Sequence, residues 1–295
     1  MIQDKIKGVG VALITPFNNY EVDYEALARM IDHVIDGGVD YIVALGSTAE
    51  TATLSIEERK QVLRFVVERT AGRVPIVAGM GANDTRALVN HLRTFDLSGT
   101  VAILSVVPYY NKPSQEGIYR HYMAVAEASP VPVIIYNVPG RTGVNMTAET
   151  TLRLAHATDK IFAVKEASGD INQMQRIIDG RPENFVVLSG DDGITVELVK
   201  RGGNGVISVA ANAFPKKFCR CIHDAMEGLL ADAEAQMEGF AEPISLLFRE
   251  GNPTGVKTMT AAMGLTRSEV RLPLVEGSEE LMEATKSAVA RYELR

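Results

Sequence analysis

The chain of 295 residues lacks the features that mark several classes of protein. It has only two cysteines, Cys219 and Cys221, which favours free thiols in a reducing cytoplasm over a disulfide scaffold. Its five histidines are scattered without the spacing of metal ligands. No apolar run is long enough to cross a bilayer, and no signal-peptide pattern follows the polar start. We therefore expect a cytoplasmic protein with no metal and no membrane anchor.

An excess of basic residues is also absent. The chain has 30 lysines and arginines against 37 aspartates and glutamates, which gives a net charge of -7. Proteins that bind nucleic acid or anionic membrane surfaces usually present a basic face. A hydrophobic fraction of 46% and a charged fraction of 23% are those of an ordinary soluble globular protein. The composition argues against nucleic acid and membrane partners.

Short apolar runs recur along most of the chain and are typical of strands buried on both faces of a parallel sheet. Eight such runs occupy residues 8–14, 41–45, 75–79, 101–104, 133–136, 161–164, 185–188 and 205–208. Amphipathic helical patterns separate them, one of which begins with the capping box of Ser55 and Glu58. Eight strand–helix units predict an α/β fold, the (β/α)8 TIM barrel. A doubly wound sheet is the alternative, but residues 13–17 stand where its glycine-rich turn belongs.

The strand pattern ends near Pro215, and only helical patterns follow it. We expect helices over residues 216–230, 232–248, 253–263 and 278–292. The predicted organisation is therefore a barrel in residues 1–227 that carries the active site, and a C-terminal α-helical extension in residues 228–295. We expect this extension to serve in assembly.

Lys165 has an unusual position, because it ends the sixth apolar run directly before Glu166. Lysine is rarely buried without a partner. Desolvation lowers the pKa of the ammonium group, so that the neutral amine can attack a carbonyl carbon. The alternative is a lysine whose stem packs against the core while its charged end reaches water.

The residues that follow the other strands favour the reactive interpretation. In a TIM barrel the active site lies at the C-terminal ends of the strands. Side chains there include Ser47, Thr48, Tyr109, Tyr110, Tyr136, Arg141, Lys165, Asp191 and Asp192. Lysine as nucleophile, tyrosine and hydroxyls as proton carriers, and arginine as a carboxylate ligand suit Schiff-base chemistry on a carbonyl compound. The structural alternatives are hydroxyls that cap a turn, tyrosines that pack, and an arginine in an exposed loop.

Three of these stretches resemble the signatures of a known family. Residues 46–50 (GSTAE), 136–143 (YNVPGRTG) and 164–169 (VKEASG) are similar to those of the dihydrodipicolinate synthase / N-acetylneuraminate lyase family of pyruvate-dependent Schiff-base aldolases. The similarity includes residues 108–113 and 252–257 and covers nearly the whole chain. The resemblance also implies a TIM barrel and a homotetramer built as a dimer of dimers.

The resemblance implies a role for each catalytic side chain. Lys165 forms the imine with pyruvate, and no cofactor is needed beyond this covalent imine. Tyr136 acts as general acid and base, linked through Ser47 to Tyr110, which reaches in from the neighbouring subunit.

The resemblance also implies the residues that bind substrate. Thr48 holds the carboxylate of pyruvate, and Arg141 holds that of aspartate semialdehyde. Gly190 and Ile207 contribute backbone groups near the imine. Arg141 and the paired tyrosines favour the synthase branch, which condenses these two substrates in the diaminopimelate route to lysine.

Two alternatives stay open at this point. Ser47 stands where the synthase branch usually has threonine and resembles the start of the lyase motif, so cleavage of N-acetylneuraminate or another 2-keto-3-deoxy acid is the second enzymatic hypothesis. Arg141 argues against it, because it favours a short dicarboxylate-like product. A non-catalytic barrel that senses a keto acid is disfavoured, because the reactive residues are all present.

Feedback inhibition by lysine is predicted to be weak or absent. Lysine-inhibited members of the family carry histidine and glutamate at the positions of Arg59 and Ala87, while Asn83 and Tyr109 are retained. Without that carboxylate, the ammonium group of a bound lysine loses its main charge partner. A lysine titration of the activity should show little inhibition at millimolar lysine. Strong inhibition below millimolar lysine would contradict the prediction.

Overall fold

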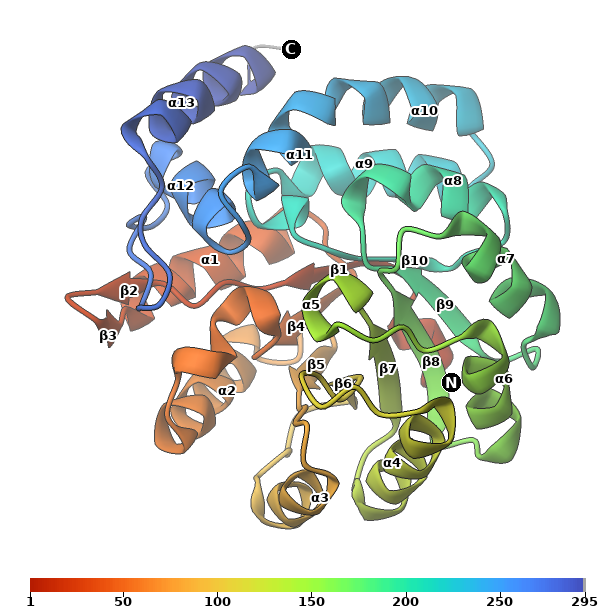
Figure 1. Ribbon diagram of the computed structural model, residues 1–295. Helices are drawn as coiled ribbons and strands as arrows, with labels where there is room; N and C mark the ends of the chain where they lie inside the picture. Colours follow the sequence, from red (N-terminus) through yellow and green to blue (C-terminus); the bar gives the residue numbers. More distant parts are fainter. Residues whose placement is uncertain (294–295) are drawn as a thin grey trace.

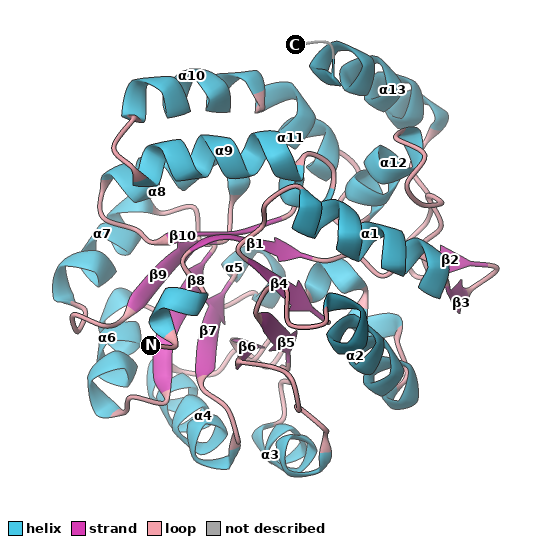
Figure 2. Ribbon diagram, turned by 180° about the vertical axis from the view of Figure 1, so that it is seen from behind, coloured by secondary structure: helices cyan, strands magenta, loops and turns pink. Residues whose placement is uncertain are grey.

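The computed structural model describes residues 1–293 and contains a closed barrel of eight parallel strands surrounded by helices (Figures 1 and 2). The strands of the barrel are β1 (Gly8–Ala12), β4 (Tyr41–Ala44), β5 (Ile76–Gly79), β6 (Ala102–Val106), β7 (Val133–Asn137), β8 (Ile161–Glu166), β9 (Val186–Ser189) and β10 (Gly205–Ser208). Each strand pairs with the next along the chain, and β10 pairs with β1 to close the barrel. The predicted TIM barrel is confirmed.

The helices that follow the strands cover the outside of the barrel. They are α1 (Tyr24–Asp36), α2 (Ile56–Thr70), α3 (Thr85–Thr94), α4 (Gln115–Ala128), α6 (Ala148–Ala157), α7 (Ile171–Gly180), α8 (Thr195–Lys200) and α9 (Pro215–Met226). Helix α2 begins at the predicted capping box, in which the Ser55 hydroxyl accepts from the Glu58 N–H and the Glu58 carboxylate accepts from the Ser55 N–H.

Several short elements lie in the connections. They are the hairpin of β2 (Phe17–Asn18) and β3 (Glu21–Val22), the short helix α5 (Pro139–Thr142), and single 3₁₀ turns at Gln3–Lys5, Ser47–Ala49, Thr51–Thr53, Asp192–Ile194 and Ala210–Asn212. Four of the five 3₁₀ turns follow the C-terminal ends of strands β4, β9 and β10. They therefore shape the end of the barrel at which the site lies.

Four helices follow the barrel, namely α10 (Leu230–Gly239), α11 (Ala241–Phe248), α12 (Thr254–Ala262) and α13 (Glu279–Glu293). The sequence predicts one helix over residues 232–248, and this prediction is wrong. Pro243 lacks the N–H that a helix interior needs, so the chain breaks at Phe240 and Pro243 falls in the first turn of α11. Phe240 is buried against Phe218.

The division of the chain at residues 227 and 228 stays a prediction. It falls directly after α9, and α10 packs against both α9 and α8. Among the residues that the structure describes, no helix is both long and apolar enough to span a lipid bilayer.

The strands are buried on both faces, which explains their continuous apolar runs. Side chains inside the barrel form one apolar cluster, which includes Tyr41, Val77, Leu104, Phe162 and Leu188. A second and larger cluster packs the outer faces of the strands against the helices. Because the interior is filled, a ligand is accommodated only above the strand ends.

Candidate active site

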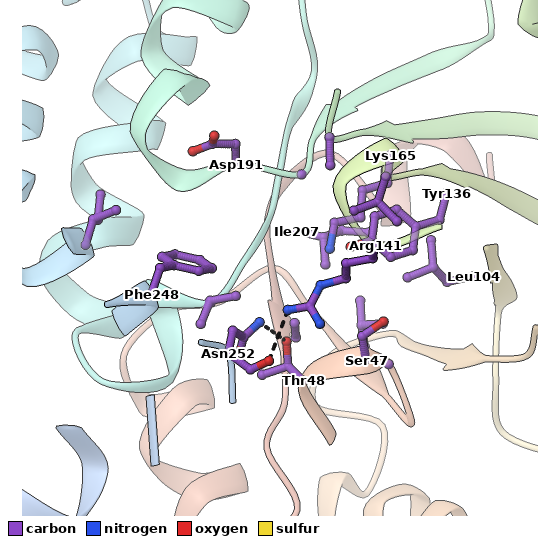
Figure 3. A pocket seen from close by; sticks show the side chains of 18 of the residues that line it. Ser47, Thr48, Leu104, Tyr136, Arg141, Lys165, Asp191, Ile207, Phe248 and Asn252 are labelled. Carbon is purple, nitrogen blue, oxygen red and sulfur yellow. Dashed lines mark hydrogen bonds between the residues drawn. The ribbon is translucent and has the colours of Figure 1, made fainter. Parts of the chain in front are cut away.

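A cavity of about 420 Å³ opens at the C-terminal ends of the strands. Of the eight residues to which the resemblance assigns a role, seven line it: Ser47, Thr48, Tyr136, Arg141, Lys165, Gly190 and Ile207. Figure 3 labels all of these except Gly190. They come from loops and strands spread over 160 residues of sequence, and the closure of the barrel brings them together. The eighth residue, Tyr110, lies outside this cavity.

Lys165 lies at the end of β8 with its side chain almost entirely buried, at 5% exposure. Burial lowers its pKa from the ordinary value of 10.5 to about 8, against the opposing charge of the Asp192 carboxylate. Its Nζ lies 4.4 Å from the centre of the Tyr136 ring, which is the register neighbour on β7. The amine therefore reaches its neutral, nucleophilic form at a lower pH than an exposed lysine does.

Tyr136 is 7% exposed and lies beside the amine. Burial raises the pKa of its phenol, and the nearby Arg141 guanidinium opposes that effect. A protonated phenol in this position is suited to donate a proton to a developing alkoxide or hydroxyl group.

Glu166, the residue after Lys165, is fully buried on the other side of β8. Its carboxylate accepts from the Asn137 side-chain amide at 3.0 and 3.1 Å, from the Ser168 N–H at 2.8 Å and from the Gln173 side-chain amide at 3.2 Å. Burial raises the pKa of this carboxyl group, and these donors oppose the effect. The network fixes the end of β8, so that Lys165 projects from a rigid support.

The turn that carries Ser47 and Thr48 is held in an unusual conformation. Leu45 and Glu50, on either side of it, have φ angles of 57° and 53°. Left-handed conformations of residues other than glycine cost roughly 1–3 kcal/mol each and persist only where the surroundings enforce them. The Thr51 hydroxyl donates to the carbonyl oxygens of Leu45 at 2.8 Å and Gly46 at 2.9 Å. A strained turn of this kind is typical of functional sites.

Arg141 and Thr48 are joined by one residue of the C-terminal segment, Asn252. Its side-chain amide donates to the Thr48 hydroxyl at 3.0 Å, and its backbone carbonyl oxygen accepts from the Arg141 guanidinium at 3.0 Å (Figure 3). The sequence interpretation quoted Asn252 only as part of a motif. It missed this bridge because the contact joins residues 111 and 204 positions apart.

The C-terminal helices also line the cavity, through Ile244, Ser245 and Phe248 of α11. The sequence interpretation assigned them to assembly only. Their apolar residues have the spacing of an ordinary amphipathic helix. This pattern does not distinguish side chains that line a cavity from side chains that pack in the core.

Gly190 leaves room for Lys165. A Cβ atom at this position would lie 2.5 Å from the Ala167 Cβ and 3.1 Å from the Lys165 Cε. The Gly190 N–H donates to the Glu166 carbonyl oxygen at 2.7 Å. Ile207, on β10, is 1% exposed and forms part of the floor.

Asp192 is a further residue whose position the sequence did not reveal. Its side chain is buried at 2% exposure, and its Oδ2 accepts from the N–H groups of Val209 at 3.1 Å and Ala210 at 2.9 Å. Its Oδ1 has no hydrogen-bond partner among the described residues. The sequence places Asp192 near a strand end but gives no sign that its carboxylate is buried.

Tyr110 is 88% exposed and has a φ angle of 74°. Its predicted role across a subunit interface stays a prediction. A second cavity of about 520 Å³ adjoins the first through Tyr136 and Arg141 and contains Tyr109 and Arg59. The Arg59 guanidinium donates to the carbonyl oxygens of Thr51 at 2.7 Å and Leu54 at 3.1 Å.

A desolvated lysine at the end of a barrel strand, facing a cavity with tyrosine, hydroxyl and arginine side chains, defines a class I Schiff-base aldolase. The particular family follows from comparison with known proteins. The chain belongs to the dihydrodipicolinate synthetase family, whose model matches residues 5–292.

Relatives agree with this assignment. The chain is 55% identical over 276 residues to the 4-hydroxy-tetrahydrodipicolinate synthase of Phocaeicola vulgatus, covering 93% of both chains, and equally similar to that of Parabacteroides distasonis. The dihydrodipicolinate synthase of Aquifex aeolicus is 40% identical with a TM-score of 0.94, covering 98% of this chain and 99% of that one. The enzyme of Thermotoga maritima is 35% identical with a TM-score of 0.96, covering 99% and 100%.

The pKa of Lys165 should set the pH dependence of imine formation. The rate at which pyruvate becomes trapped by borohydride should rise with pH and level off above about 8, where the amine is neutral. Asp192→Asn removes a negative charge that raises the pKa of Lys165, so its profile should shift to lower pH. Asp191→Asn, which changes an exposed neighbouring carboxylate, is the control and should shift the profile less. An unchanged or raised midpoint in Asp192→Asn would refute this electrostatic account.

Proposed function

We propose that the chain catalyses the reaction of 4-hydroxy-tetrahydrodipicolinate synthase, the condensation of pyruvate with aspartate semialdehyde in lysine biosynthesis. The observation that carries this proposal is the desolvated Lys165, at 5% exposure, facing a cavity that also contains Tyr136, Thr48 and Arg141. Relatives that carry this name at 55% identity support it.

The proposed reaction begins on the amine of Lys165. The neutral amine adds to the keto carbon of pyruvate, and loss of water leaves the imine. Tyr136 supplies the proton that the departing hydroxyl group needs and later accepts one from the methyl carbon, which gives the enamine. The enamine carbon then bonds to the aldehyde carbon of aspartate semialdehyde, which restores the imine to Lys165. The aldehyde C=O double bond becomes a single bond, and its oxygen takes a proton from Tyr136 to become a hydroxyl group. The amino group of that substrate displaces Lys165 from the imine carbon, which closes the ring and frees the enzyme.

Two parts of the cavity are proposed to hold the carboxylates. Thr48 binds that of pyruvate, with the backbone of Gly190 and Ile207 close to the imine. Arg141 binds that of aspartate semialdehyde, because a guanidinium group pairs with a carboxylate through two parallel hydrogen bonds. The contacts of Asn252 support this assignment of the two carboxylates, since they hold Thr48 and Arg141 at a fixed separation. No cofactor is needed, because the imine itself activates the pyruvate.

A homotetramer, as a dimer of dimers, is proposed to complete the site. The proton relay from Tyr136 through Ser47 ends at Tyr110, which is 88% exposed and lies outside the cavity of its own chain. A tyrosine exposed in this way is available to enter the cavity of a second copy. One solved structure of similar fold, 35% identical with a TM-score of 0.96, is of a monomeric dihydrodipicolinate synthase variant, so the fold by itself does not fix the assembly. We further propose a cytoplasmic location, where the free thiols of Cys219 and Cys221 stay reduced.

A lyase that cleaves N-acetylneuraminate is the second candidate. Ser47 favours it, because it resembles the start of the lyase motif. The two activities are separated by assaying pyruvate with aspartate semialdehyde and, in parallel, the cleavage of N-acetylneuraminate.

The synthase assay should give turnover with the semialdehyde alone. Lys165→Ala should lose turnover and pyruvate trapping together, because the nucleophile is gone. Arg141→Ala should raise the KM for aspartate semialdehyde about 10- to 100-fold, the effect of losing a charged hydrogen bond. It should still trap pyruvate, with the pH profile of trapping shifted to higher pH because Arg141 helps to lower the pKa of Lys165. Turnover of N-acetylneuraminate alone would overturn the synthase proposal. Pyruvate trapping without turnover of either substrate would indicate a sensor.

A further inference from the structure

A buried ion pair, Glu50 with Lys257, joins the C-terminal helices to the turn that carries Ser47 and Thr48. Glu50 directly follows that turn, and Lys257 lies within α12. Their side chains are 1% and 0% exposed, and neither lines the cavity that contains Lys165. Charged groups this deeply buried are costly unless they are paired, so the contact between them is a strong constraint.

The Lys257 ammonium group contacts one carboxylate, one carbonyl oxygen and one aromatic ring. Its Nζ donates to the carbonyl oxygen of Glu269 at 2.9 Å and lies 3.9 Å above the centre of the Phe17 ring. Burial lowers its pKa to about 8, and the Glu50 carboxylate opposes that effect. Glu50 is the one carboxylate that the structure records in contact with this ammonium group among the described residues.

Glu50 is held by a second group of the C-terminal segment as well. Its Oε2 accepts from the backbone N–H of Arg271 at 2.9 Å. The Arg271 guanidinium lies over the same Phe17 ring, 4.4 Å from its centre, and pairs with Glu58 at 2.6 Å. Two separate stretches of the C-terminal segment, α12 and the residues before α13, therefore converge on one carboxylate of the barrel.

The backbone at Glu50 needs such an anchor. Its φ angle of 53° lies in the left-handed region, where residues other than glycine are strained, and Leu45 at the other end of the turn has a φ angle of 57°. A Cβ atom at Gly79 would lie 2.0 Å from the Leu45 carbonyl oxygen, so the strand beside the turn also fits it closely. The ion pair at Glu50 and the Thr51 hydroxyl are therefore among the contacts that hold the turn in this conformation.

We propose that Glu50 and Lys257 are positioning residues of the reaction, which hold the turn so that Thr48 meets the pyruvate carboxylate and Ser47 lies in the proton relay. This inference rests on the proposed function, because it uses the roles of those two hydroxyl groups. It makes the C-terminal helices part of the machinery that binds pyruvate.

The test compares variants of the full-length enzyme. Glu50→Gln keeps the shape of the side chain and removes its charge, and Lys257→Met keeps the apolar stem. Both should raise the KM for pyruvate at least 10-fold and lower kcat by up to roughly 100-fold, the effect of misplacing a group by about 1 Å. The KM for aspartate semialdehyde should change less than the KM for pyruvate, because Arg141 lies on a different loop and is linked to the turn only through Asn252. Lys257→Arg keeps the charge and should recover part of the loss.

The control is an ion pair at the opposite end of the barrel. The His223 side chain on α9 contacts the Asp40 carboxylate at 2.7 Å, just before β4 begins. His223→Gln weakens a partly exposed contact between helix and barrel, with side chains 39% and 37% exposed, and should lower the unfolding temperature slightly while leaving both KM values unchanged. All variants are assayed well below their own unfolding temperatures, and circular dichroism verifies the fold.

Three outcomes decide the question. A raised KM for pyruvate in Glu50→Gln, absent in His223→Gln, supports the positioning role. Wild-type KM and kcat in Glu50→Gln and Lys257→Arg, with only the unfolding temperature lowered, would overturn it even if Lys257→Met does not fold. A wild-type enzyme that traps no pyruvate would instead overturn the proposed function, which keeps the two failures apart.

Discussion

The desolvation of a single amine is the constraint on which the site depends. Lys165 follows four apolar residues of β8 and precedes the buried Glu166, so its stem is held in the barrel while its side chain lines the cavity. The chain contains a second lysine, Lys257, whose pKa burial also lowers to about 8. The two differ in what they face. The ammonium group of Lys257 is paired with the Glu50 carboxylate. Lys165 lines a cavity of about 420 Å³, where its amine is accessible to a carbonyl compound.

The barrel carries the proposed reactive groups around Lys165, and both the barrel and the C-terminal segment hold those groups in place. The buried network around Glu166 fixes the strand end beneath the amine. The strained turn at residues 45–50 presents two hydroxyl groups, and its conformation is enforced largely from the C-terminal segment through Asn252 and Lys257. Under the proposed roles of these hydroxyl groups, binding of pyruvate would depend on the packing of helices that contain none of the proposed catalytic residues.

Much of this architecture could be predicted from the sequence, because strands buried on both faces leave continuous apolar runs and a lysine at the end of one is conspicuous. The barrel was predictable for that reason, and seven of the eight residues to which the resemblance assigns a role line one cavity. The bridge by Asn252 and the Glu50–Lys257 pair were not, since they join positions at least 111 residues apart that no local pattern connects. The break at Phe240 does not follow from the apolar spacing, which continues across it. Pro243 is the local signal, because proline disfavours the interior of a helix.

The most direct measurement is to locate the trapped substrate. The enzyme is incubated with pyruvate, reduced with borohydride, digested, and the modified peptide is identified by mass spectrometry. The account predicts that the adduct lies on Lys165 alone and that Lys257, equally shifted in pKa but facing Glu50, stays unmodified. An adduct on Lys257 or on exposed lysines, or none on Lys165, would contradict the claim that desolvation beside an open cavity creates the nucleophile.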